Sequence, residues 1–207
     1  MLPLSRAAVP PAPVLARGRA GALSRFAVRL LRLAGWRVLL AEPVPPKSVV
    51  VFYPHTSNWD FPVGLLASWA TGIEFRWVGK HTLFETPLRR LFLRWGGIPV
   101  DRRDPAGFVD TLVRAYAASP TFHLVITPEG TRRRSEHWKS GFHRVAVAAG
   151  VPVGLAFIDR PRRQVGLGGW LTLSGDADAD LAQLRAFYAE KGAWRPHNAG
   201  PIRFRGR

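Results

Sequence analysis

The chain has 207 residues, of which 47% are apolar, so it is long enough for one domain with a substantial hydrophobic core. Thirty lysines and arginines stand against fourteen acidic residues, and the formal charge of +16 predicts an anionic partner: nucleic acid, a membrane surface or an acidic substrate. The sequence contains no cysteine, which excludes disulfides, a thiolate nucleophile and a cysteine-based zinc site.

The N-terminal residues 1–22 are rich in proline, and we expect them to form a flexible tail. Three prolines interrupt the only apolar stretch of this tail, which is not typical of a signal peptide. Charged residues also interrupt every apolar run of the chain before it reaches the roughly 18 to 20 residues that span a bilayer. We therefore expect no transmembrane segment.

Helical periodicity begins at Leu23, and we expect a basic amphipathic helix over residues 23–41. One face of this helix carries Leu23, Phe26, Leu30, Leu33 and Ala34, and another carries Arg25, Arg29, Arg32 and Trp36. Two interpretations remain open: the helix packs on the domain with a solvated basic face, or it lies in a membrane interface. The prolines of "EPVPPK", residues 42–47, end it.

Strand and helix signals alternate after residue 47. Short β-branched or aromatic runs predict strands over 48–53, 75–79, 98–100, 122–127, 151–158 and 165–174. Helical stretches are expected near Pro62–Ala70, Phe84–Trp95, Phe108–Ala118, Gly141–Ala149 and Asp178–Lys191. This alternation favours a single α/β domain over residues 48–195, with a mostly parallel or mixed central sheet flanked by helices. Residues 196–207, which include "PIRFRGR", are interpreted as a basic C-terminal tail.

The stretch "HTSNWD" follows the first strand and contains His55 and Asp60. A histidine whose second ring nitrogen faces a carboxylate has a fixed tautomer and can act as general base toward a hydroxyl. The other interpretation is structural, with Ser57 or Asn58 capping the next helix and Asp60 in its first turn. The two interpretations are compatible.

Two further motifs follow strands of the same predicted sheet. "TPEGTRRR" places the hydroxyl of Thr131 and the guanidinium of Arg132 after a turn at Gly130, an arrangement that suits a phosphate group. Its alternative is a solvated basic loop. "GGIPVDR" ends a strand in Asp101 and Arg102, which could also form an ordinary surface ion pair. All three motifs fall after strand ends, where sites gather in sheets of this kind.

Taken in this order, the motifs resemble those of the 1-acylglycerol-3-phosphate (lysophosphatidate) acyltransferase family, within the wider glycerolipid acyltransferases. The family's His-x-Ser-x-x-Asp pattern is matched by His55, Ser57 and Asp60, and its Lys-x-x-Leu-Phe-x-x-Pro pattern by Lys80, Leu83, Phe84 and Pro87. The second and third family motifs are matched by Gly96, Ile98, Val100, Asp101 and Arg102, and by Pro128, Glu129, Gly130, Thr131 and Arg132. The resemblance spans about residues 49 to 158.

The resemblance implies transfer of an acyl group from acyl-coenzyme A or acyl carrier protein to a lysophospholipid hydroxyl. His55 and Asp60 would be the catalytic pair, and the residues expected to bind substrate are Lys80, Arg102, Glu129, Gly130, Thr131 and Arg132. Glu129 is expected to orient an arginine or to bind the acceptor glycerol. With no cysteine and no Gly-x-Ser-x-Gly elbow, direct transfer in a ternary complex is expected, although Ser57 stands near enough to His55 to be an alternative nucleophile.

No cofactor is expected, and the other five histidines show no metal-ligand spacing. The charge and the amphipathic helix predict a peripheral protein on the anionic cytoplasmic face of the inner membrane, with no nucleic-acid partner. Three alternatives remain open: acylation of another lysolipid such as lyso-ornithine lipid, non-catalytic lipid binding, and nucleic-acid binding.

Overall fold

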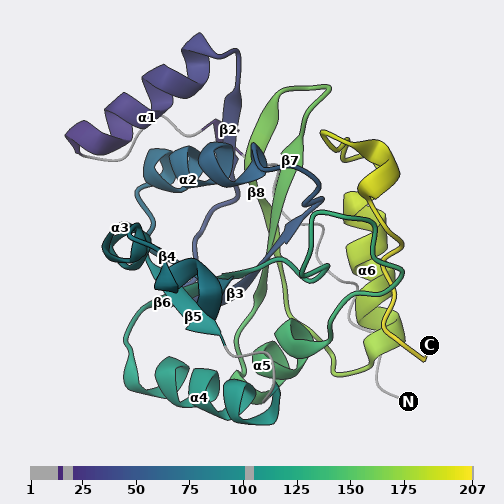
Figure 1. Ribbon diagram of the computed structural model, residues 1–207. Helices are drawn as coiled ribbons and strands as arrows, with labels where there is room; N and C mark the ends of the chain where they lie inside the picture. Colours follow the sequence, from purple (N-terminus) through teal and green to yellow (C-terminus); the bar gives the residue numbers. More distant parts are fainter. Residues whose placement is uncertain (1–13, 16–20, 101–104, 207) are drawn as a thin grey trace.

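An eight-stranded mixed sheet runs through the middle of the computed structural model, which describes residues 14–15, 21–100 and 105–206 (Figure 1). The elements follow one another as β1 (Val14–Leu15), α1 (Ala22–Leu33), β2 (Arg37–Leu40), β3 (Lys47–Tyr53), α2 (Asp60–Thr71), β4 (Phe75–Lys80), the 3₁₀ helix η1 (His81–Glu85), α3 (Arg89–Arg94), β5 (Gly97–Val100), α4 (Pro105–Ala118), β6 (Phe122–Ile126), α5 (Gly141–Ala149), β7 (Val153–Asp159), β8 (Gln164–Leu171), α6 (Ala177–Tyr188) and the 3₁₀ helix η2 (Pro196–Asn198).

The strands lie in the order β1-β2-β8-β7-β3-β6-β4-β5. Strands β7, β3, β6, β4 and β5 run parallel to one another, whereas β8 is antiparallel to β7. The edge is completed by β2, parallel to β8, and by β1, antiparallel to β2. All six predicted strands are present, and the predicted single α/β domain with a mixed sheet flanked by helices is confirmed.

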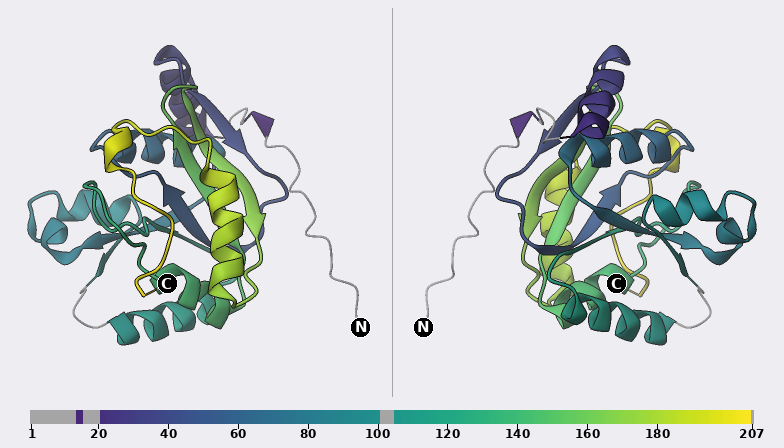
Figure 2. Two further views of the ribbon diagram at one scale, coloured as in Figure 1. Left: turned by 90° about the vertical axis from the view of Figure 1, so that its right-hand side faces the viewer. Right: turned by 90° about the vertical axis from the view of Figure 1, so that its left-hand side faces the viewer.

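Helices cover both faces of the sheet. Strand β3 is central and almost wholly buried, as its run of β-branched residues requires. Because side chains alternate along a strand, Val49 and Val51 enter the core with residues of α4, α5 and α6, whereas Val50 belongs to a separate cluster on the other face. Figure 2 shows α6 in front of the sheet from one side and α1 and α2 in front of it from the other. The cavity described below lies on the α2 face.

The predicted N-terminal helix is too long in its C-terminal half. Helix α1 ends at Leu33, and the chain turns at Gly35, whose φ of 75° lies in the left-handed region that favours glycine. Residues Arg37–Leu40 then form β2 beside β8, and Trp36 is buried instead of sharing an exposed basic face. The predicted helix continued past Gly35, although the observed helix has ended before it. Beyond Gly35, pairing with β8 determines the conformation of the chain.

Helix α1 presents three faces. A narrow face of small and apolar residues packs on α2, with Ala27 and Leu31 in the core and the Ser24 hydroxyl donating to the Ala70 carbonyl at 3.0 Å. The predicted apolar face does not enter the core: the exposed fractions are 54% for Leu23, 57% for Phe26, 40% for Leu30 and 87% for Leu33. The third face carries exposed Arg25, Arg29 and Arg32. The helix therefore packs on the domain and still leaves an apolar surface open.

Both predicted tails are corrected where the structure describes them. Val14–Leu15 pairs with β2, within the segment predicted to be a flexible tail; residues 1–13 and 16–20 lie outside the described residues. At the other end, residues 196–206 are not a loose basic tail. Phe204 is buried beside Phe142, and it forms an isolated bridge with Trp138. Within the basic run, the apolar residues Ile202 and Phe204 were the sequence signal for this packing.

Candidate active site

The residues predicted for the site follow three neighbouring parallel strands. His55 and Asp60 come after β3, Thr127 to Arg132 after β6, and Lys80 ends β4. Since β3, β6 and β4 lie side by side and run in the same direction, their carboxyl ends meet at one edge of the sheet. Segments more than seventy residues apart in the sequence are thereby brought together.

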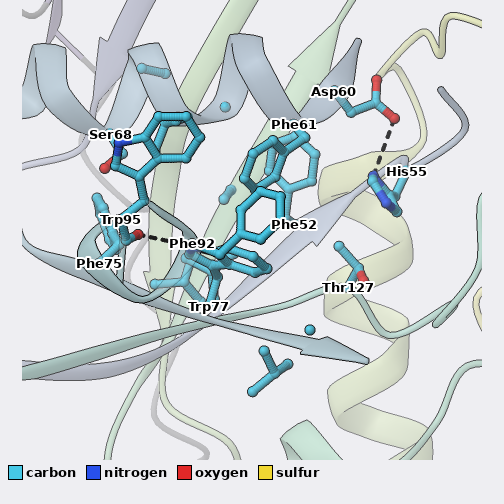
Figure 3. A pocket seen from close by; sticks show the side chains of 18 of the residues that line it. Phe52, His55, Asp60, Phe61, Ser68, Phe75, Trp77, Phe92, Trp95 and Thr127 are labelled. Carbon is cyan, nitrogen blue, oxygen red and sulfur yellow. Dashed lines mark hydrogen bonds and ion pairs between the residues drawn. The ribbon is translucent and has the colours of Figure 1, made fainter. Parts of the chain in front are cut away.

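A cavity of about 660 Å³ begins at these loops and extends between α2 and the sheet (Figure 3). Six residues predicted for the site line it: His55, Asp60, Lys80, Gly130, Thr131 and Arg132. The rest of the lining is mostly apolar, and its rings come from Phe52, Phe61, Phe75, Trp77, Phe92 and Trp95. Figure 3 shows His55, Asp60 and Thr127 on one side and the Trp77, Phe92 and Trp95 rings on the other. The cavity thus joins a polar region with titratable groups to an apolar region.

His55 and Asp60 form the pair that the spacing predicts. The His55 Nδ1 atom lies 3.2 Å from Asp60 Oδ2, although the two groups are not aligned as a hydrogen bond. The same Oδ2 accepts the backbone N–H groups of Thr56 at 2.7 Å and Ser57 at 2.8 Å, which fix the fully buried carboxylate. A carboxylate beside Nδ1 favours the tautomer with the proton on Nδ1, so Nε2 keeps its lone pair for a substrate proton.

The structural interpretation of "HTSNWD" is confirmed for Asp60, which lies in the first turn of α2, and is wrong for the helix cap expected at Ser57 or Asn58. The Ser57 hydroxyl accepts the Trp59 backbone N–H at 3.2 Å, just before α2 begins at Asp60. Trp59, and not Ser57 or Asn58, is the N-cap residue, and it makes no side-chain capping bond. Ser57 therefore shapes the turn that brings Asp60 back to His55.

Glu129 lies behind the cavity wall and does not line it. Glu129 is 2% exposed, and its Oε2 accepts the His55 backbone N–H at 2.9 Å. Burial raises the pKa of Glu129 from an ordinary 4.5 to about 7, against the opposing effect of the His55 and Gly200 backbone groups. Glu129 was predicted to bind substrate or to orient an arginine; the structure places it against the loop that carries His55. The order of motifs along the chain could not predict this contact, because the contact joins the "HTSNWD" and "TPEGTRRR" motifs, which follow different strands of the sheet.

The turn after β6 carries Gly130, Thr131 and Arg132, and all three line the cavity. Gly130 has a φ of 66°, in the left-handed region that favours glycine, and the Lys139 side chain lies over it, with Nζ 2.9 Å from where a Cβ atom would be. Arg132 lines the cavity, whereas Arg134 turns away to Glu136 Oε1 at 2.8 Å. Lys139 is a basic residue of this turn that sequence reasoning missed, because no spacing rule links it to Gly130.

The remaining predicted residue, Arg102, lies outside the described residues together with Asp101. Among the residues that the structure does describe, no three histidine or acidic side chains form a group that could hold a metal ion. The described helices also include none that is long and apolar enough to cross a membrane.

Comparison with known proteins identifies the family of the chain. The family model described as Acyltransferase matches residues 36–154, which is more than half of the sequence. The chain belongs to the acyltransferase family. The matched segment contains the His55 and Asp60 pair, the Lys80 strand and the turn from Pro128 to Arg132. It ends within β7, so β8, α6 and everything beyond them lie outside the match.

The fold of this acyltransferase is also that of a solved structure. The chain is similar to the 1-acyl-sn-glycerophosphate (LPA) acyltransferase PlsC from Thermotoga maritima, with a TM-score of 0.54 and 18% sequence identity over 84% of this chain and 80% of that one. At this identity the likeness shows the fold. No curated protein matches the sequence.

Proposed function

We propose that this acyltransferase moves a fatty acyl group from an acyl thioester to the free hydroxyl of 1-acylglycerol-3-phosphate. The observation that carries the proposal is the single cavity that joins a His/Asp pair, a basic glycine turn and an apolar region. These three parts correspond to what the reaction needs: a base for the hydroxyl, a binding site for the phosphate and room for an acyl chain.

The proposed chemistry is direct transfer in a ternary complex. His55 Nε2 removes the proton of the acceptor hydroxyl as its oxygen attacks the thioester carbonyl. The carbon–sulfur bond then breaks, and the imidazolium returns the proton to the leaving thiolate. Asp60 stabilises the imidazolium at 3.2 Å. General-base assistance of this kind contributes a factor of about 10² to 10⁴, and the positioning of two bound substrates supplies much of the rest.

The acceptor phosphate is proposed to bind at the turn after β6. Arg132, Thr131 and the backbone at Gly130 line the cavity there, Lys80 lines it from β4, and Lys139 packs against Gly130. Guanidinium groups bind phosphate with paired, charge-assisted hydrogen bonds. The apolar region under α2 would hold an acyl chain, and the donor would be acyl-coenzyme A or acyl carrier protein.

The acceptor is tested by supplying a panel of lysolipids with one labelled acyl donor and identifying the labelled lipid. We expect a phosphate monoester acceptor to be preferred over lysophospholipids with larger headgroups and over lyso-ornithine lipid. If lyso-ornithine lipid were preferred, the proposed acceptor would be wrong and the proposed acyl transfer would still stand. Salt-dependent binding of DNA or RNA without any acyl transfer would contradict the enzyme proposal as a whole.

Arg132 and Arg133 provide a matched pair of variants for the phosphate site. Arg132→Ala should lower kcat/KM for lysophosphatidate by about 10- to 100-fold, since a charge-assisted hydrogen bond contributes about 1.5 to 3 kcal/mol. Arg133 is exposed and is not among the residues that line the cavity, so Arg133→Ala should retain near wild-type kinetics. Steady-state kinetics with the acceptor varied measures both. Equal effects of the two substitutions on kcat/KM would indicate that the acceptor phosphate does not bind at Arg132.

We also propose that the open apolar face of α1 attaches the enzyme to the cytoplasmic face of a membrane. Leu23, Phe26, Leu30 and Leu33 are exposed in a row, and the face beside them carries three arginines and no acidic residue. An apolar row beside a basic face is typical of helices that lie in the interface of anionic bilayers. A lysolipid substrate is itself embedded in such a surface.

Vesicle binding tests the attachment surface. Because burying a leucine or phenylalanine contributes about 1.5 to 3 kcal/mol, Phe26→Ser with Leu33→Ser should weaken binding to anionic vesicles at least tenfold. Val147→Ser is the matched control, since Val147 is an exposed apolar residue of α5, on the opposite face of the sheet. Co-sedimentation with vesicles containing an anionic lipid gives the comparison. Equal binding by all variants would place the attachment surface elsewhere.

A further inference from the structure

The C-terminal segment, defined here as residues 193–204, contacts both catalytic loops although it lies outside the family match. It follows α6 and includes η2. In Figure 1 it is the yellow chain that leaves the top of α6 and passes beside the loops of the site. Its contacts on the two loops are made at different points, so the segment connects loops that come from different strands.

Aromatic contacts anchor the segment at both ends. Near its start, Trp194 packs against Trp36 with ring centres 5.8 Å apart, and the Arg160 guanidinium lies 4.6 Å from its ring centre. At its end, Phe204 is buried against Phe142 and His143. A segment fixed at both ends can hold what it touches between them.

The first contact is with the loop that carries His55. The Arg195 backbone N–H donates to the Thr56 hydroxyl at 3.2 Å, one residue from the catalytic histidine. The Tyr53 hydroxyl, at the end of β3, donates to the Gly200 carbonyl at 3.0 Å. Thr56 is 1% exposed, so its hydroxyl has little access to water as a replacement partner.

The second contact is with the loop that follows the Glu129 turn. Arg134 donates to the Ala199 carbonyl at 3.0 Å, and the Trp138 backbone N–H donates to the Arg203 carbonyl at 2.7 Å. Gly200 is packed so closely that an added Cβ atom would lie 1.8 Å from the Ser135 carbonyl oxygen. The segment therefore fits this loop, which directly continues the phosphate-binding turn, with almost no free space at Gly200.

We propose that the C-terminal segment is a positioning element of the active site, which holds the His55 loop and the phosphate-binding turn at a fixed separation. The inference rests on the proposed function, because that separation sets the distance from the acceptor phosphate to the general base. None of the residues 193–204 lines the cavity. The segment thus acts through the two loops and not on substrate, and its loss should lower kcat more than it raises KM.

Thr56 offers a conservative pair of substitutions for the first contact. Thr56→Val keeps the shape and removes the acceptor of the Arg195 N–H, and we expect kcat to fall about 5- to 100-fold with little change in either KM. Thr56→Ser keeps the acceptor and should restore kcat to within about threefold of the wild type. Equal kcat values for the valine variant and the wild type would overturn the proposal.

A substitution at Gly200, within the C-terminal segment itself, provides a second test. Gly200→Ala must move the segment away from Ser135 and should lower kcat as Thr56→Val does, whereas Gly141→Ala, which adds a Cβ where nothing lies within 4 Å, should not. If both substitutions act through the same positioning, the loss of kcat in the double variant will be smaller than the product of the single losses. Independent, multiplying effects would show that the segment does not act through the His55 loop.

Hydrogen exchange separates this proposal from the proposed function and does not require activity. The His55, Thr56 and Ser57 amides donate to the buried carboxylates of Glu129 and Asp60, so they should exchange slowly. In Gly200→Ala and Thr56→Val these three amides should exchange at least tenfold faster, while amides of β3 keep their protection. If these amides exchange faster in the variants but the wild type transfers no acyl group, the positioning role of the segment is supported and the proposed function is wrong. Unchanged exchange would contradict the positioning whatever the activity.

Discussion

Replacing His55 by alanine should lower kcat/KM for acyl transfer by about 10² to 10⁴-fold, because the substitution removes the imidazole whose Nε2 is proposed to accept the hydroxyl proton. Asp60→Asn should cause a loss of similar order, since an amide oxygen in the place of Oδ2 can still accept the two backbone N–H groups but carries no negative charge to stabilise the His55 imidazolium. Steady-state turnover of an acyl thioester with lysophosphatidate measures both variants, and thermal unfolding shows whether they are folded.

Ser57→Ala is the control that separates general-base catalysis from a covalent route. The Ser57 hydroxyl accepts the Trp59 N–H, and the proposed mechanism gives it no other part. We therefore expect the variant to keep turnover within about tenfold of the wild type, since one hydrogen bond contributes about 0.5 to 1.5 kcal/mol. Near wild-type turnover by both His55→Ala and Asp60→Asn would refute the catalytic assignment, and a loss in Ser57→Ala as large as that in His55→Ala would favour an acyl-serine.

Glu129→Gln should make the protein more stable at pH 8, relative to the wild type, than at pH 5. Burial raises the pKa of Glu129 from 4.5 to about 7, so the folded protein binds this proton more tightly than the unfolded chain does. As pH rises from the unfolded pKa of 4.5 to the folded pKa of about 7, the free energy of unfolding of the wild type falls, because folding must either bury the charged carboxylate or take up a proton. Glutamine carries no charge and removes that loss, which amounts to at most about 3 kcal/mol for a shift of this size.

Urea unfolding at pH 5, 6, 7 and 8 measures this difference. The free energy of unfolding of Glu129→Gln minus that of the wild type should increase with pH over this range. Glu136→Gln is the matched control from the same loop: Glu136 is half-exposed and pairs with Arg134 and Arg203, so its substitution should have a small effect with little pH dependence. A pH-independent difference for Glu129→Gln would contradict the burial of a titrating carboxyl at this position.

The part of the site that local spacing determines could be predicted from the sequence. His55 and Asp60 are five residues apart across one turn, and the Gly130 turn lies within one motif, so each arrangement is set by its own stretch of chain. Alternating strands and helices then implied that these loops meet at the carboxyl ends of parallel strands, as they do. The cavity lining confirms this placement for His55, Asp60, Lys80, Gly130, Thr131 and Arg132.

Contacts between distant segments could not be predicted in this way. Glu129 was assigned by its motif to the substrate, and its bond to the His55 backbone depends on β3 and β6 being neighbours in the sheet. The C-terminal segment looked like a basic tail because its packing depends on backbone groups and on single residues such as Phe204. Helix α1 shows the same limit, since its apolar periodicity left open what that face contacts, and the face that packs on the domain is another one, with the smaller residues Ser24 and Ala27.

The most direct test of the account is a rapid-quench experiment with purified protein, an acyl thioester labelled in its acyl group, and lysophosphatidate. The account predicts that the label passes from thioester to phosphatidate without residing on the protein, and that His55→Ala forms phosphatidate at least about 100-fold more slowly. It would be contradicted if no labelled lipid formed with any lysolipid, or if the label accumulated on the protein before it reached the lipid.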